Sequence, residues 1–240
     1  MRRKSGWRMR VVVVLGLLMA GSMIYQTHIA SPPSVEASSR QLTTAPPRAV
    51  VGISQSDRDQ ATDIDMDEVR ALVAEAVSLA GGFEGLIEDG DVVVLKPNLI
   101  SDYDMTNDSQ DLPQEVNGMT TDWRIAQAVV EMVRAINPTG RILILEGVCN
   151  GTTEGNMESL GYLPEQIQGV DDFVHLEDRS GGWREYDSSL LVEVVLPDGI
   201  GLYPDRLKVN RSSEFYLNRL YYEADVVISL PVLKNHAISG

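Results

Sequence analysis

Continuous apolar runs that alternate with amphipathic segments constrain the fold of this chain more than any other feature. Runs rich in Val, Ile and Leu occur at residues 91–95, 141–145 and 223–230. Such runs are typical of strands that are buried on both faces of a sheet. Apolar residues at helical spacing occur between them, at residues 65–79 and 122–136. With a further apolar run at residues 49–53, this order predicts an α/β fold with a β-α-β-α-β start, a mainly parallel sheet, flanking helices and right-handed crossovers.

The pattern becomes looser after residue 146. A short helix is predicted at residues 157–160 and a strand at residues 172–176. Two apolar runs, at residues 190–196 and 200–203, flank a Pro-Asp-Gly turn and predict a hairpin. We therefore expect a smaller irregular insertion with a hairpin beside the main sheet.

The first residues of the chain have the pattern of an export signal. Residues 1–10 carry five basic side chains, and an apolar run follows at residues 11–23. An uncleaved membrane anchor is the alternative, although the polar residues Gln26 and His28 make a poor span of the roughly 20 residues that a bilayer needs. The predicted organisation is a signal peptide or N-terminal membrane anchor at residues 1–37, a flexible linker at 38–48 and an α/β domain at 49–240. The predicted location is extracytoplasmic, with the membrane contacted only through the N-terminal segment.

Composition excludes several classes of function. The 240 residues carry a formal net charge of −15, and a surface this acidic repels the phosphate backbone of nucleic acids. Cys149 is the one cysteine, so the chain by itself cannot form an internal disulfide, a cysteine-rich zinc site or an iron–sulfur cluster.

Polar side chains follow directly after the first and the last of the three long apolar runs. Lys96 and Asn98 follow the first run, and Lys234 and His236 follow the last. Because ligands of open parallel sheets bind beyond the carboxyl ends of the strands, we expect these side chains to share one edge. Thr121 stands at the start of the second long helix, where free amides can hold an anion. We therefore predict a site for a small anionic ligand, bound by Lys96, Asn98, Thr121 and Lys234, with His236 as the catalytic proton carrier because its unperturbed pKa lies closest to neutral.

The same part of the sequence allows other interpretations. A lysine after a buried strand often pairs with an acidic neighbour, and Glu146 and Asp225 are candidates for Lys96. Glu146, Asp178 and Asp225 could also form an oxygen-rich metal site. Cys149 could be a nucleophile, although a lone cysteine is more often a small buried residue.

Three stretches of the sequence together resemble the domain-of-unknown-function family 362 (DUF362). They are residues 92–99 (VVVLKPNL), 120–136 (beginning TTDW) and 224–236 (ADVVISLPVLKNH). The resemblance covers about residues 49–240 and implies an α/β fold. It places Lys96, Asn98, Thr121, Asp225, Lys234 and His236 at the family's motif positions.

The chain departs from this family in two ways. Many relatives carry a ferredoxin-like segment with clustered cysteines, and no such cluster transfers to a chain that has only Cys149. Relatives usually continue beyond the motif that ends at His236, so the resemblance leaves open that the chain is truncated at its C-terminus. The leading hypothesis is an exported protein of unknown reaction that binds a small anion. A non-catalytic extracytoplasmic binding module and a metal-dependent hydrolase or transferase are the alternatives.

Overall fold

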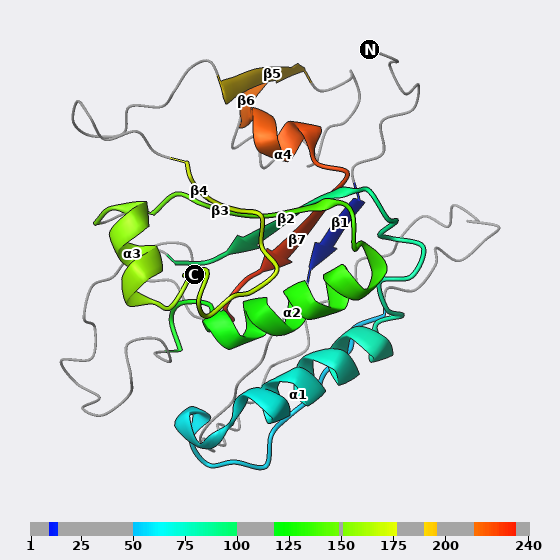
Figure 1. The fold of residues 1–240 in the computed structure, drawn as a ribbon, viewed down its shortest axis with the longest axis vertical. Helices are drawn as coiled ribbons and strands as arrows, with labels where there is room; N and C mark the ends of the chain where they lie inside the picture. Colours follow the sequence, from blue (N-terminus) through cyan, green and yellow to red (C-terminus); the bar gives the residue numbers. More distant parts are fainter. Residues whose placement is uncertain are drawn as a thin grey trace, which may run out of the picture.

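The computed structural model describes residues 10–13, 50–99, 118–148, 151–176, 190–195 and 214–233. Five parallel strands form the main sheet, in the order β1-β7-β2-β3-β4 (Figure 1). Their bounds are Arg10–Val13 for β1, Val226–Leu230 for β7, Val92–Pro97 for β2, Arg141–Glu146 for β3 and Asp172–His175 for β4. The predicted α/β class with a parallel sheet is therefore confirmed.

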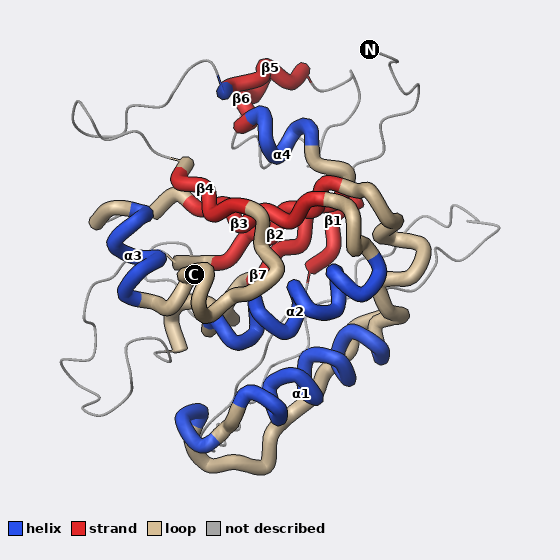
Figure 2. The backbone as a smooth tube through the Cα atoms, viewed as in Figure 1, coloured by secondary structure: helices blue, strands red, loops and turns tan. Residues whose placement is uncertain are grey.

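Helices cover the sheet in two layers. Figures 1 and 2 show α1 (Met66–Leu79) and α2 (Trp123–Ile136) on one face of the sheet, while the short α4 (Arg219–Glu223) lies on the other. The remaining helices are α3 (Thr153–Ser159) and the short 3-10 helix η1 (Ala61–Asp63). A two-stranded antiparallel sheet of β5 (Leu191–Val195) and β6 (Glu214–Asn218) lies on the same side as α4. Residues 200–203, which the sequence predicts as the hairpin partner of β5, lie outside the described residues.

The central strands are buried on both faces, as the continuous apolar runs predict. Val93 and Leu95 of β2 face the larger core cluster with α1 and α2, and Val94 faces the smaller cluster on the side of α4. All three side chains are fully buried, and each contributes roughly 1.5–3 kcal/mol relative to an exposed position. Lys96 and Pro97, at the carboxyl end of β2, therefore follow directly after a stretch of strand that is packed on both faces.

Both long helices begin at an aspartate that caps their first turn. The Asp65 carboxylate accepts a hydrogen bond from the Glu68 amide at the start of α1, and Asp122 does the same for Arg124 at the start of α2. Gly82 has a φ of +77° and donates its N–H to the Val77 carbonyl oxygen, which ends α1 in a left-handed turn.

Residues 50–53 form no strand, so the prediction of a strand at residues 49–53 is wrong for the described part of that run. The segment lies along α1 instead: a Cβ at Gly52 would fall 1.9 Å from the Ala76 carbonyl oxygen. The place that a first strand would take, beside β7, is held by β1. β1 comes from the segment that the sequence predicts as an export signal.

None of the helices in the described part of the chain combines the length and apolarity required to cross a membrane.

Candidate functional site

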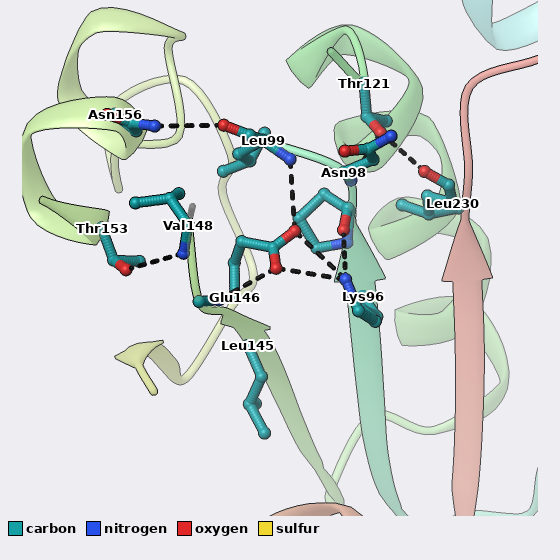
Figure 3. Close-up of polar contacts among 12 residues, drawn as sticks. Lys96, Asn98, Leu99, Thr121, Leu145, Glu146, Val148, Thr153, Asn156 and Leu230 are labelled. Atoms are coloured by element: carbon teal, nitrogen blue, oxygen red, sulfur yellow. Dashed lines mark hydrogen bonds and ion pairs between the residues drawn. The ribbon is translucent and has the colours of Figure 1, made fainter. Parts of the chain in front are cut away.

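The strand register brings the carboxyl ends of β2, β3 and β7 to one edge of the sheet. Leu95 pairs with Ile144 of β3, and Pro97 pairs with Leu230 of β7. The residues that follow these pairs therefore lie next to one another. Figure 3 shows Lys96, Asn98 and Glu146 at this edge.

The ammonium group of Lys96 is paired with the carboxylate of Glu146. Lys96 Nζ lies 3.1 Å from Oε1 and 3.2 Å from Oε2, and it also donates to the Pro97 carbonyl oxygen at 3.0 Å (Figure 3). The two partners differ in burial: the side chain of Lys96 is 44% exposed and that of Glu146 is 6% exposed. Lys96 therefore has one side fixed by the protein and one side open to solvent.

Backbone amides complete the surroundings of Glu146. The Gly147 N–H donates to Oε1 at 2.9 Å, and the Leu99 N–H donates to Oε2 at 3.2 Å. Two amides and one ammonium group thus converge on one nearly buried carboxylate. Such charge-assisted hydrogen bonds fix a carboxylate in position and offset its desolvation.

Thr121 joins three elements at this edge. Its Oγ1 accepts a hydrogen bond from the Asn98 N–H at 2.9 Å and donates to the Leu230 carbonyl oxygen at 2.6 Å. Its own N–H donates to the Asn98 carbonyl oxygen at 3.0 Å. The hydroxyl group is buried, and its one O–H donor is committed to the Leu230 carbonyl oxygen, which leaves it no hydrogen to donate to an anion. Thr121 therefore shapes the site rather than offering a free hydroxyl to a ligand.

Two buried side chains hold the backbone of this site in place. Asn156 Nδ2 donates to the Leu99 carbonyl oxygen at 3.1 Å, and the Tyr162 hydroxyl donates to the Thr121 carbonyl oxygen at 3.0 Å. Burial, with smaller contributions from the charges of Asp122 and Glu146, raises the pKa of Tyr162 well above its ordinary value. Tyr162 is therefore a hydrogen-bond donor at every physiological pH, and its role is structural.

The start of α2 is occupied by the protein's own carboxylate. Asp122 accepts from the Arg124 N–H at 2.9 Å and forms an ion pair with the Arg124 guanidinium group at 2.6 Å. Arg124 also donates to the Ile64 and Ala61 carbonyl oxygens, which ties η1 to α2. The start of α2 is thus capped by Asp122, a residue of the helix's own sequence.

The structure brings together four of the residues singled out from the sequence: Lys96, Asn98, Thr121 and Glu146. The pairing of Lys96 with Glu146 is the ion pair that sequence analysis considered as an alternative. Lys234, His236, Asp178 and Cys149 lie outside the described residues.

Asp225 lies at the other end of the sheet. Its N–H donates to the Val92 carbonyl oxygen, and its Oδ2 accepts from the Val92 N–H at 3.0 Å. Val92 pairs with Arg141, five residues before Glu146 on β3, so Glu146 lies about 16 Å away at the usual rise per residue. The proposed metal trio of Glu146, Asp178 and Asp225 therefore cannot close around one ion. Within the described ranges, no other group of acidic, histidine or cysteine side chains has the geometry of a metal site.

Sequence reasoning missed the backbone amides of Leu99 and Gly147 and the support from Asn156. The sequence does not reveal which backbone N–H groups reach a site, because every residue except proline supplies one. Gly147, directly after a residue at a strand end, was the available hint, since glycine is common where backbone closely approaches another group.

Comparison with known proteins gives one family. The model of the domain of unknown function DUF362 matches residues 93–240, which is more than half of the chain and includes every residue of the site described above. No curated protein and no solved structure matches the chain. The strand-end motifs, the parallel sheet and this match agree, and the chain belongs to the DUF362 family.

Proposed function

We propose that the carboxyl edge of β2, β3 and β7 binds a small anionic ligand, with Lys96 as its main described contact. The observation that carries this proposal is the position of the Lys96 ammonium group. It is held on one side by Glu146 and the Pro97 carbonyl oxygen, and its side chain is 44% exposed at the sheet edge where ligands of parallel sheets bind.

The charge of the chain supports an anion rather than a nucleic acid as the ligand. With a net charge of −15, the chain repels large polyanions. A small phosphate or carboxylate needs only a local positive group, and an ammonium group has three N–H donors for that purpose. One N–H shared between the two Glu146 carboxylate oxygens and one N–H on the Pro97 carbonyl oxygen leave the third for a ligand.

Two further residues are proposed as contacts from the other strand. Lys234 and His236 follow β7 within six residues of Leu230, whose carbonyl oxygen is anchored by Thr121. A second ammonium group would add to the positive charge at the edge, and an imidazole would exchange a proton near neutral pH. Asn98, which lies between Lys96 and Thr121 in Figure 3, would orient the ligand through its amide.

The proposed setting is extracytoplasmic. The five basic residues and the apolar run at the N-terminus support export, and a signal peptide or an anchor would both place the domain outside the cytoplasm. The proposal includes no reaction. An enzyme would lose turnover in H236Q, whereas a binding module would keep ligand binding in that variant without any turnover.

Titration calorimetry with inorganic phosphate and with a small dicarboxylate tests the proposal. K96A should weaken binding about tenfold or more, because hydrogen bonds to charged groups contribute roughly 1.5–3 kcal/mol. R141Q is the matched control: it removes the same charge from an exposed position at the amino end of β3. Binding in R141Q should equal that of the wild type.

A second variant separates binding from folding. K96A leaves Glu146 nearly buried without its cation, so K96A/E146Q removes both charges together. Binding must stay weak in K96A/E146Q. Unchanged binding of both anions in K96A and in the double variant, or an equal loss in R141Q, overturns the proposal.

A further inference from the structure

The outer edge of β7 is completed by a strand that the sequence predicts to be an export signal. β1 pairs with β7 in parallel, from Arg10 opposite Val226 to Val13 opposite Ser229. The inner edge of β7 pairs with β2. We call residues 1–37, the predicted export signal or anchor, the leader. A chain without the leader would expose the N–H and C=O groups of β7 that face away from β2, and such an open edge can pair with another strand.

A second strand-forming segment lies exposed elsewhere in the structure. Residues 50–53 have the sequence Val-Val-Gly-Ile, which is rich in the β-branched residues that strands favour. Val50 is 66% exposed, Val51 69% and Ile53 65%. Apolar side chains contribute to stability when they are buried. In this placement the three side chains stay largely in contact with water and contribute little.

The direction of this segment suits the outer edge of β7. Gly52 lies against Ala76, and the Ser54 hydroxyl donates to the Leu72 carbonyl oxygen at 2.6 Å. Residues 50–54 therefore run antiparallel to α1, as the strand before a crossover helix does. A strand beneath its own crossover helix packs against it, so the contact between Gly52 and Ala76 is compatible with a place in the sheet.

The connection would also have the usual hand. The chain passes from β2 through α2 to its neighbour β3, and a strand outside β7 would lead through α1 to β2 in the same direction across the sheet. Figure 1 shows α1 on the same face as α2. Both crossovers therefore have the same hand, as the near-universal right-handed rule for such units requires.

We infer that the outer edge of β7 is a docking edge for residues 50–53, which replace Arg10–Val13 there when the leader is absent from the sheet. Two segments of one chain then compete for one edge, and removal of the leader completes the domain with its own strand. Removal of the leader rests on the proposed export. The competition between the two segments does not, and it can be measured on the full chain.

Hydrogen exchange of the full chain tests the inference with paired prolines. Adjacent prolines are needed because only alternate amides of an edge strand face the neighbouring strand. V11P/V12P blocks the leader strand, V50P/V51P blocks the replacement, and the quadruple variant blocks both. V11T/V12T is the control, since threonine keeps the backbone donor and the β-branched shape.

The inference predicts a specific pattern of protection. In V11P/V12P the β7 amides should stay protected, and residues 52 and 53 should gain about tenfold or more in protection. In V50P/V51P the β7 amides should also stay protected. In the quadruple variant, the β7 amides that face away from β2 should lose their protection. The loss of stability in the quadruple variant should exceed the sum of the two pairs, as for segments that substitute for one another.

Three results would overturn the inference. The first is loss of β7 protection in V11P/V12P while residues 50–53 still exchange freely. The second is failure of V11P/V12P to fold. The third is a loss of stability in the quadruple variant that equals the sum of the losses in the two double variants. Protection of β7 that depends on protein concentration would assign the edge to a second copy of the chain, and this outcome also contradicts docking of residues 50–53.

Discussion

The Thr121 hydroxyl donates a hydrogen bond of 2.6 Å to the carbonyl oxygen of Leu230, the last residue of β7. The Thr121 hydroxyl oxygen in turn accepts a hydrogen bond from the Asn98 N–H, so one buried hydroxyl group links the residue after β2, the end of β7 and the segment before α2. The chain that leads to Lys234 and His236 therefore leaves the sheet from a fixed point beside Lys96.

Replacement of Thr121 by valine should destabilise the protein. Valine has nearly the same shape but leaves the Asn98 N–H and the Leu230 carbonyl oxygen without their partner, at a cost of roughly 1–3 kcal/mol for each buried unsatisfied group. Urea denaturation measures the change. T121S keeps the hydroxyl and should recover most of the loss, whereas equal stability of T121V and T121S would show that the hydroxyl bonds contribute nothing.

Replacement of Glu146 by glutamine should strengthen the binding of anions. The variant removes the negative charge 3.1 Å from the Lys96 ammonium group while keeping a side chain of the same size. The amide can accept from only one of the two backbone N–H donors, so the free energy of unfolding should fall by about 1–3 kcal/mol.

Calorimetry with inorganic phosphate should give a lower dissociation constant for E146Q than for the wild type. E158Q is a charge-matched control within α3. Weaker binding in E146Q than in E158Q would mean that the Glu146 carboxylate contributes to the ligand site directly, contrary to the role assigned to it.

Glu131 should contribute to the loss of stability in acid. Its hydrogen bonds with the Arg70 guanidinium group, which joins α1 to α2 at 2.8 and 2.9 Å, hold the pKa of the Glu131 carboxyl below its ordinary value against an opposing effect of burial. A depressed pKa means that the folded protein binds fewer protons than the unfolded chain. The contribution is therefore complete above the unfolded pKa of about 4.3 and is lost as the pH falls through the folded pKa.

Urea denaturation at pH 7 and pH 3 checks this sign. E131Q should lose less stability than the wild type between these two values. E75Q, an exposed position on α1 for which the described residues provide no ion pair, should behave as the wild type does. An equal acid-induced loss in wild type and E131Q would contradict the assignment.

Much of the fold followed from the sequence because burial on two faces demands continuous apolar runs. β7 lies within its predicted run, and β2 and β3 begin within theirs and extend beyond them by two residues and one residue. Both long helices begin one residue inside the predicted segments and end with them. The family was also evident from the residues around Lys96 and Thr121, and the family match confirms it.

Strand order was beyond the reach of local patterns. Residues 50–53 have the composition of a strand, but a strand also needs a vacant edge, and β1 occupies the one beside β7. The pairing of Lys96 with Glu146 joins positions 50 residues apart, so only the register of β2 with β3 decides it. Asp225 precedes β7, so it lies at the amino ends of the parallel strands, whereas Glu146 lies at their carboxyl ends.

The central claim is that the exposed side of Lys96 contacts an anion, and NMR of the lysine side chains tests it most directly. The chain has four lysines, so selective labelling yields few signals, and K96R identifies that of Lys96. Addition of inorganic phosphate, and separately of a dicarboxylate, should shift the Lys96 signal in a saturable way, while the Lys4 signal stays in place. A Lys96 signal that does not move at anion concentrations that saturate the calorimetric titration would contradict the account.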